Sequence, residues 1–483
     1  MFPVAFHAVT IDDYVTARPF FYGGVVLTGV CLLVGLAAQT WRIRKPVRAV
    51  LLTIVGTYLV LPAILALPLI ETVHGLSFLD GYFEMLSSLT TTGATLLDQP
   101  VLVPQSVHLW RVLIAWLGGL MIWVSAIALL APLRLGDFEL MASRVRKGQT
   151  GSGYTGLQEP RTRLAQHAWE LAPIYLGLTM ILWILLLLSG EDPFVAFCHA
   201  MSTLATSGIS PIGGLETATS GRIGEAAIAG FFVFAIVRRS FTKDMTSNLG
   251  TPFWREPELR AAGFIIFLLT TFLILRHWVA IDVVSSPRGG YAFLTAAWGS
   301  LFTSLSFLTT TGFVSLDWGT AQIWSGLTTP GLILLGLALI GGGVATTAGG
   351  VKLLRVYILY HQGQREMSLL VHPSSVASLG TKERAILPQN AMIAWVFFMT
   401  FGISICATML ALTALGVDFE AACVLAIAAL STTGPLIVHA PDEVISLSTL
   451  PDLAKIVLCI AMILGRLGTL TIVALLNPGF WRV

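Results

Sequence analysis

Four short stretches of the sequence combine threonine or serine hydroxyls with a glycine in a way that could bind a cation. They read TTTGA at 90–94, ATSGI at 205–209, TTTGF at 309–313 and STTGP at 431–435, so their glycines are 115, 104 and 122 residues apart. Rings of backbone carbonyl oxygens can replace the hydration shell of a monovalent cation. Four such turns meeting at one axis would therefore form an ion filter.

Backbone chemistry explains why these residue types suit that task. Glycine adopts backbone conformations closed to other residues and lets an ion approach closely, while threonine hydroxyls can anchor a turn to its walls. The alternative, turns that only cap helices, is disfavoured because all four recur in a matching context. We call them the threonine–glycine turns, and their candidate filter residues are Thr91, Thr92, Gly93, Ala94, Thr206, Ser207, Gly208, Ile209, Thr310, Thr311, Gly312, Phe313, Thr432, Thr433, Gly434 and Pro435.

The elements around these turns belong to a membrane protein. The 483-residue chain is only 11% charged, whereas about 25% of the residues of a soluble domain are charged. Apolar runs long enough to span a bilayer recur at 20–39, 49–70 and 173–190, and further near 112–132, 223–237, 262–281, 329–340, 391–415 and 454–477. A β-barrel would show short alternating segments instead, so the predicted fold is an all-α polytopic membrane protein.

A shorter apolar segment comes directly before each turn. These segments lie at 80–89, 192–205, 291–307 and 418–430. Because a spanning helix needs about 20 residues, we expect them to be re-entrant. Aspartates stand at the expected N-cap positions of three of them: Asp80, Asp192 and Asp418. The partially negative C-terminal ends of such helices would point at the pore and favour a cation there.

Charge in the loops predicts the orientation of the chain. Lys and Arg are enriched in cytoplasmic loops, and four stretches hold four or five of them each: 42–48, 144–163, 238–260 and 352–384. By contrast, no Lys or Arg occurs at 71–110, 189–221 or 416–454, where three of the turns lie. We therefore expect the turns to face outward and the basic loops to face the cytoplasm.

Each turn lies in the same order of elements, namely a spanning helix, the short segment, the turn and another spanning helix. Because every unit returns to the same side, we expect four parallel repeats around a pseudo-fourfold pore, preceded by an extra N-terminal helix. The predicted divisions are 1–47 for the N-terminal extension with one spanning helix, then 48–135, 136–240, 241–360 and 361–483 for pore repeats 1 to 4.

Two features inside the apolar segments suggest a gate. The stretch LIGGGVATTAGGVK at 339–352 interrupts the second helix of repeat 3, and such a break is tolerated only beside protein or a water-filled path. A nucleotide-binding glycine loop would need a preceding strand and a βαβ unit, which this apolar context does not offer. The candidate gate residues are Gly341, Gly342, Gly343, Thr346, Thr347, Gly349 and Gly350, in a gate loop spanning 341–350, together with Arg466.

Arg466 is the second of these features, because it lies within the apolar run 456–476. An arginine in the middle of a membrane is costly, so it should face the pore or a partner. The alternative is a snorkelling side chain or a salt bridge to another helix. A charge in the pore would oppose the passage of cations.

Several longer motifs resemble the membrane subunits of Trk-type potassium uptake systems, the TrkH/TrkG/Ktr/HKT superfamily. The resemblance covers roughly residues 40–483. It rests on FEMLSSLTTTGAT (83–95), LWRVLIAWLGGLMIWV (109–124), WREPELR (254–260), LTTTGF (308–313), GGGVATTAGGVKLLRVYILYHQGQRE (341–366), LVHPSSV (370–376) and LGRLGTLTIVALLNPGFWR (464–482).

The resemblance implies potassium passage across the bacterial inner membrane, entering from the periplasmic side. It implies a filter around the four turn glycines, with the gate loop and Arg466 below it. Sodium-preferring relatives often carry serine at the first of these glycines, so Gly93 favours potassium. Glu84 matches an acidic position in the first pore helix of the family, which implies that it braces the filter through hydrogen bonds.

The resemblance also implies partners. It indicates a homodimer in membrane lipid, docked on a cytoplasmic TrkA-like ring that binds nucleotides such as NAD or ATP. No cofactor is expected in this chain besides K⁺ as the transported ion, and nucleic acid is not an expected partner.

The sequence departs from the family pattern in three places. One clear span, rather than two, precedes the first repeat. Ser431, Thr432 and Thr433 replace an asparagine-rich fourth filter segment, and Gly468 stands where a glutamate normally follows Gly-Arg-Leu. These departures concern the N-terminal topology, the fine selectivity and the neighbourhood of the gate.

Three other functions are alternatives to potassium passage. A sodium-permeable or cation-coupled symporter of the same superfamily is the main alternative. Other secondary carriers usually show inverted or twofold repeats, whereas this chain has four parallel units. An intramembrane enzyme would need a nucleophile with a base or a metal cluster, and the apolar runs contain neither. We therefore expect a transport protein and not an enzyme.

Overall fold

The described part of the chain is helical throughout. The computed structural model describes residues 1–38, 46–126, 160–237, 256–280, 290–327, 329–344, 346–371, 387–441 and 445–468. Within these ranges there are helices and connecting turns but no strand, so the prediction of an all-α protein is confirmed. Only a helix pairs all the backbone polar groups of a single segment in lipid, which explains why the long apolar runs fold in this way.

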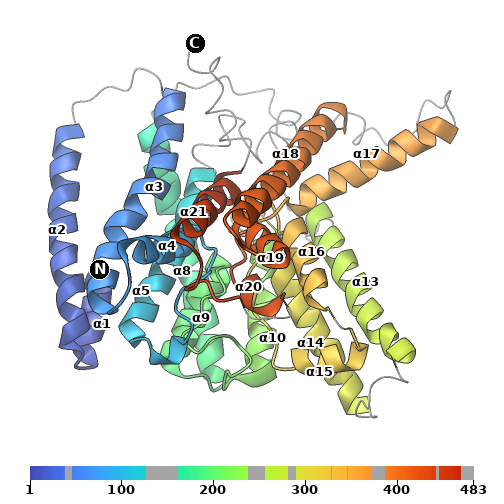
Figure 1. Cartoon of the computed structure of the whole chain (residues 1–483), viewed down its shortest axis with the longest axis horizontal. Coiled ribbons are helices and arrows are strands. Elements are labelled where there is room, and N and C mark those ends of the chain that lie inside the picture. The colour runs from blue at the N-terminus through green and yellow to red at the C-terminus, as the bar shows by residue number, and fades with distance from the viewer. Residues whose placement is uncertain are drawn as a thin grey trace.

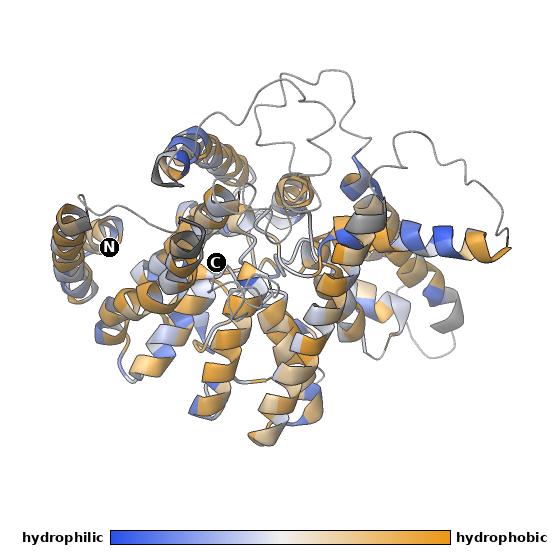
Figure 2. Cartoon of the chain, turned by 90° about the horizontal axis from the view of Figure 1, so that it is seen from above, coloured by the Kyte–Doolittle hydropathy of each residue, from blue (hydrophilic) through white to orange (hydrophobic). Residues whose placement is uncertain are grey.

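Seven helices are long and apolar enough to cross a membrane, and hydrophobic residues predominate on them (Figure 2). They are α2 (Tyr14–Ala38), α3 (Pro46–Thr72), α5 (Gln105–Ser125), α8 (Pro160–Leu188), α13 (Pro257–Ala280), α14 (Gly290–Leu308) and α18 (Leu387–Ala414). Figure 1 shows α2 at the left edge of the molecule, beside α1 and α3, and several shorter elements meeting near the centre.

Four helices precede the threonine–glycine turns: α4 (Phe78–Leu89), α9 (Pro193–Ala205), α14 and α19 (Phe419–Leu430). We call them the pore helices. Three of them have 12 or 13 residues, as expected for re-entrant segments. The expectation that all four are too short to span is wrong for α14, whose 19 residues reach the length of a spanning helix, because it extends one residue beyond each end of the predicted segment 291–307.

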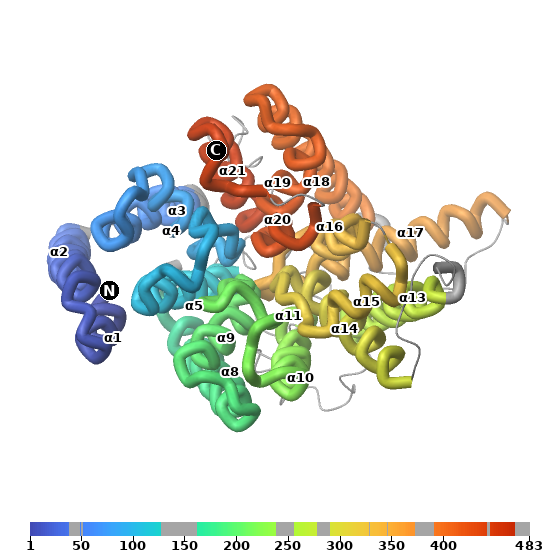
Figure 3. The backbone as a smooth tube through the Cα atoms, turned by 60° about the horizontal axis from the view of Figure 1, so that its bottom comes forward, coloured from blue at the N-terminus to red at the C-terminus, as the bar shows by residue number. Residues whose placement is uncertain are grey.

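The helices that follow the turns connect each unit to the next. They are α5, α10 (Gly221–Phe231), α16 (Gly331–Ile340) and α21 (Asp452–Leu467). Each packs against the pore helix of the following unit, and α21 packs against α4, so the fourth unit contacts the first. Figure 3 shows this circular order, from blue through green and yellow to red.

The N-caps of the pore helices differ from the expectation at one position. Asp192 caps α9 by accepting hydrogen bonds from the backbone of Phe194 and Val195, and Asp418 is the N-cap residue of α19, without a side-chain bond. Asp80 is not an N-cap. Ser77 caps α4, and Asp80 lies three residues later in a capping box, where it also pairs with Lys455 of α21 at 2.6 Å.

Several expectations fall wholly or partly outside the described residues. These include most of the basic stretches at 42–48, 144–163 and 238–260, and the motifs at 370–376 and 464–482. The fourth basic stretch, 352–384, is partly helical and partly buried, rather than an exposed loop throughout. Its first part forms α17 (Leu353–Val371), and two of its cations, Lys352 and Arg355, are buried because the chain folds them against the interior.

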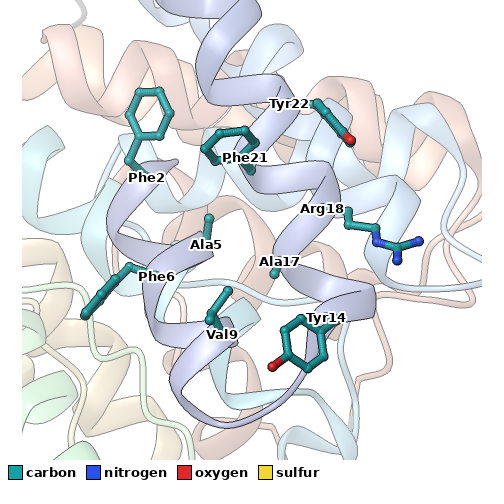
Figure 4. A pocket seen from close by; sticks show the side chains of 9 residues that line it. All are labelled: Phe2, Ala5, Phe6, Val9, Tyr14, Ala17, Arg18, Phe21 and Tyr22. Carbon is teal, nitrogen blue, oxygen red and sulfur yellow. The ribbon is translucent and has the colours of Figure 1, made fainter.

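The N-terminus consists of a short helix and one long helix. α1 (Phe2–Thr10) lies against α2, and the two enclose a pocket of about 400 Å³. Figure 4 shows that Phe2, Phe6 and Phe21 are among its lining side chains. None of its lining residues belongs to a threonine–glycine turn, so the pocket is separate from the site described next.

Candidate functional site

The four turns share an unusual backbone conformation. Six non-glycine residues in the described part of the chain have a positive φ, and four of them stand two positions before a turn glycine. They are Thr91 (54°), Thr206 (52°), Thr310 (57°) and Thr432 (53°). Such left-handed conformations are uncommon outside glycine and concentrate at functional sites. Their recurrence at equivalent positions indicates a shared task.

One backbone hydrogen bond fixes each turn to the end of its pore helix. In every case the residue before the turn glycine donates its N–H to the carbonyl oxygen five residues earlier. The pairs are Thr92 to Ser87 (2.8 Å), Ser207 to Ser202 (3.0 Å), Thr311 to Ser306 (3.0 Å) and Thr433 to Ala428 (2.9 Å). The four turns are therefore built alike.

The turns also contact one another in a closed ring. A Cβ atom added to Gly93 would collide with the carbonyl oxygen of Ser207 in the second turn. An added Cβ would likewise collide with the Thr311 carbonyl oxygen at Gly208, with the Pro435 ring at Gly312 and with the Ala94 backbone nitrogen at Gly434. In addition, the Gly434 N–H donates to the carbonyl oxygen of Thr92 at 2.6 Å. The structure thus brings all four sets of predicted filter residues together.

A buried carboxylate braces the segment that leaves the first turn. Glu84 lies on α4, nine residues before Gly93, and is 1% exposed. It accepts hydrogen bonds from the Thr95 hydroxyl and the Leu96 N–H, both at 3.0 Å. Arg111 of α5 pairs with it at 2.5 Å. The bracing role implied for Glu84 is thus matched by its contacts, but its cationic partner could not be recognised from the sequence.

The same position carries polar side chains in two other repeats. His199 lies nine residues before Gly208, and its Nε2 is 2.8 Å from the Ser210 hydroxyl. Thr303 lies nine residues before Gly312 and accepts the Ser315 N–H at 3.3 Å. In the fourth repeat the position is apolar. Counting nine residues back from each glycine would have revealed these residues, which the search for motifs missed.

A second buried carboxylate, Glu191, stabilises an outer loop of the second repeat. It accepts hydrogen bonds from the N–H and hydroxyl groups of both Thr219 and Ser220. Burial alone would raise the pKa of Glu191, but these hydrogen bonds outweigh it and the pKa lies below its ordinary value. None of these contacts involves a threonine–glycine turn.

Replacing Arg111 with alanine should lower the stability of the protein strongly. The change leaves the Glu84 carboxylate buried without its cation, which typically costs about 3–5 kcal/mol. We expect a clear fall in the thermal denaturation midpoint of the purified protein. The double variant Arg111→Met with Glu84→Gln removes both charges and should recover much of the loss. An unchanged midpoint for Arg111→Ala would contradict a stabilising role for the ion pair.

The gate loop does interrupt the second helix of repeat 3, between α16 and α17. Its contacts reach the C-terminal ends of the pore helices and the first residues of the turns. The Thr347 hydroxyl donates to the Leu204 carbonyl oxygen at 3.2 Å, and the Gly349 N–H donates to the Thr310 hydroxyl oxygen at 2.7 Å. A Cβ atom on Gly349 would collide with the Ser431 carbonyl oxygen. The loop therefore lies directly against the third and fourth turns and against the end of the pore helix that precedes the second.

Two buried cations hold this loop from different helices. Arg466 of α21 is 7% exposed and donates from Nη1 to the Thr347 carbonyl oxygen. Lys352 directly precedes α17. Its ammonium group donates to the carbonyl oxygen of Ala348, the residue that follows Thr347. Arg466 therefore contacts the stretch 341–350, and Lys352, which the sequence places in a basic loop, contacts the same stretch.

The surroundings of Arg466 are polar. The buried hydroxyls of Tyr58 on α3 and Tyr175 on α8 lie near its guanidinium group. The site thus combines a ring of turns, a loop against its inner face and a positive charge bound to that loop.

Comparison with known proteins is consistent across sequence and structure. The TrkH family, described as cation transport proteins, matches residues 20–478. The Trk system potassium uptake protein TrkH of Escherichia coli K12 is 32% identical over 437 residues, covering 89% of this chain and 85% of that protein. TrkI of Halomonas elongata is 28% identical over 475 residues, covering 94% and 90%. The crystal structure of the potassium transporter TrkH from Vibrio parahaemolyticus has a TM-score of 0.75 at 26% identity, covering 100% and 98%.

Proposed function

The chain belongs to the TrkH family of cation transport proteins and is a multi-pass protein of the bacterial inner membrane, and we propose that it carries potassium ions through the four threonine–glycine turns. The closed ring of turns is the observation that carries this proposal. Relatives named as potassium uptake proteins, one of them 32% identical, support K⁺ as the transported ion.

The ring has the chemical features that a potassium filter requires. Carbonyl oxygens of the four turns would replace the hydration shell of the ion, and selectivity depends on where those oxygens are held. The left-handed threonines and the bonds to Ser87, Ser202, Ser306 and Ala428 fix the backbone there. Each pore helix ends at the ring, and a helix C-terminus carries roughly half a negative charge, which favours a cation.

The gate loop would close this path from the inside. It lies against the inner ends of the turns, and Arg466 adds a positive charge in the same place. Opening would require the loop to move and break the hydrogen bonds that its carbonyl oxygens accept from Arg466 and Lys352. These roles of turns and loop agree with an N-terminal extension at 1–47 followed by four pore repeats at 48–135, 136–240, 241–360 and 361–483. Two of these boundaries, near 47 and 360, fall within α3 and α17.

A cytoplasmic regulator would control the opening. The relatives are named as members of a Trk system, and the resemblance supports a homodimer docked on a nucleotide-binding ring. The basic stretches at 144–163 and 352–384 are the proposed contact surfaces for it.

Ion flux on the purified protein tests the proposed function. Proteoliposomes loaded with the chain should pass K⁺ and Rb⁺ well ahead of Na⁺ and Li⁺, with protein-free liposomes as the control. Equal flux of all four ions would contradict a potassium filter. Flux that depends strictly on a second ion would instead favour a cation-coupled symporter.

A further inference from the structure

A buried carboxylate from repeat 2 contacts the segment that leaves the third turn. Glu225 lies on α10 and is 2% exposed. Its Oε1 accepts the Leu316 N–H at 2.6 Å, and its Oε2 accepts the Ser315 hydroxyl at 2.8 Å. The indole N–H of Trp298, on pore helix α14, also donates to Oε2 at 2.7 Å. One carboxylate therefore joins the third pore helix to the segment that follows Gly312.

This arrangement repeats the one at the first turn with a different donor helix. Glu84 accepts a hydroxyl and the N–H of the following leucine, from Thr95 and Leu96. Glu225 accepts the same pair of groups from Ser315 and Leu316. Glu84 comes from the pore helix of its own repeat, whereas Glu225 comes from the second helix of the preceding repeat. The third repeat has only Thr303 at the position of Glu84, and Glu225 supplies the missing carboxylate.

A second contact fixes α10 to the same segment. Arg222 lies one turn before Glu225 and binds Asp317 through two hydrogen bonds, of 2.6 and 3.0 Å. It also donates to the Tyr291 hydroxyl, at the start of α14, at 3.0 Å. Three consecutive residues after the third turn, 315–317, are thus held by one face of α10.

We propose that Glu225 is a positioning residue of the ion filter, which holds the third turn in place across the boundary between two repeats and thereby contributes to the discrimination of K⁺ from Na⁺. The inference rests on the proposed function of the turns as a filter. Repeats 1 and 3 occupy opposite sides of the ring, so Glu84 and Glu225 would stabilise the carbonyl positions from two facing directions. Without the carboxylate, the Leu316 and Trp298 N–H groups lose their acceptor and the segment can shift.

The variant Glu225→Gln tests this role with little change in volume. An amide offers one acceptor oxygen in place of two, so at least one buried donor loses its partner. We expect the K⁺/Na⁺ flux ratio in proteoliposomes to fall about tenfold, because a hydrogen bond to a charged acceptor is typically worth that factor or more. Potassium flux itself should persist.

Glu191→Gln is the matched control. Glu191 is similarly buried and also accepts serine hydroxyl and backbone N–H groups, but its hydrogen-bond partners, Thr219 and Ser220, lie just before α10 rather than beside a turn. This variant should keep the parental flux ratio. A general loss of buried carboxylate bonding would instead affect both variants alike.

The coupling between Glu225 and Ser315 separates positioning from mere stabilisation. Ser315→Ala alone removes one donor and should lower the flux ratio by about threefold, a typical effect for a single hydrogen bond. In the double variant Glu225→Gln with Ser315→Ala, the two reductions of the flux ratio should not add, because both substitutions act on the same contact. Ser315→Ala also gives the readout if Glu225→Gln folds poorly.

The outcomes distinguish the inference from the proposed function. If the parent protein itself does not prefer K⁺, the filter proposal fails. Alternatively, the parent prefers K⁺ while both Glu225→Gln and Ser315→Ala fold like the parent and keep its K⁺/Na⁺ flux ratio. That result would overturn the role of Glu225 and leave the filter proposal intact. A lower ratio in Glu225→Gln with an unchanged ratio in Glu191→Gln is the result we expect.

Discussion

Replacing Arg466 with alanine should raise the basal flux of potassium in the absence of any cytoplasmic partner. The guanidinium group binds the gate loop at Thr347, close to the inner ends of the turns. A unit charge 4 Å from a passing cation opposes it by about 4 kcal/mol at an effective dielectric constant of 20. Even part of that barrier would raise the flux about tenfold when removed. Rubidium uptake into proteoliposomes measures the change.

A loop variant and a control sharpen this test. Deleting Thr346, Thr347 and Ala348 removes the carbonyl oxygens that hold Arg466 and Lys352, and should also raise basal flux. Because neither change alters a residue of the turns themselves, we expect selectivity over Na⁺ to persist in both. Lys455→Gln removes another buried cation of α21, one that pairs with Asp80 at the outer end of α4, and should not raise basal flux.

Two outcomes would count against the gate. If Arg466 serves mainly to brace the fold, the alanine variant should express poorly, melt earlier and conduct no better than the parent. A stable, well-expressed Arg466→Ala protein with parental or lower flux would show that this charge does not restrict the path.

Replacing Gly93 with serine should shift the selectivity toward sodium. Gly93 has a φ of +75°, a conformation that costs other residues roughly 1–2 kcal/mol, and its new Cβ would collide with the Ser207 carbonyl oxygen. The first or second turn must therefore move, which displaces carbonyl oxygens of the ring. We expect the K⁺/Na⁺ flux ratio to fall about tenfold, equivalent to 1.4 kcal/mol of lost discrimination.

Gly190→Ser is the matched control for this prediction. Gly190 has a similar φ of +89°, but no neighbouring atom lies within 4 Å of an added Cβ. Its replacement carries the backbone strain without the collision, so the flux ratio should stay at the parental value. An unchanged ratio in Gly93→Ser would argue strongly that Gly93 does not line the filter.

The sequence alone determined the features of this protein that depend on local patterns. The lengths of the apolar runs required helices in a membrane, because only a helix pairs the backbone polar groups of a single segment in lipid. The four threonine–glycine turns could be recognised because each keeps the same residue types beside a pore helix. The break at 341–350 was visible for the same reason, since a cluster of glycines inside an apolar run cannot continue a helix.

Short-range details were less certain even where the pattern was strong. Asp80 was assigned as an N-cap, yet Ser77 takes that position and Asp80 completes its capping box. Both residue types are good caps, and only the point where the helix begins decides between them. Likewise, α14 reaches 19 residues because the helix includes one residue beyond each end of the predicted segment 291–307.

The tertiary structure decided which distant groups become partners. Arg111 lies 27 residues after Glu84, Glu225 lies 91 residues before Leu316, and Arg466 lies 119 residues after Thr347. Charge and periodicity along the chain do not specify such pairs, because many buried polar residues could satisfy one another equally well. The circular packing of each second helix against the next pore helix selects among them, since a buried charge or donor is stable only where that packing places its partner within bonding distance.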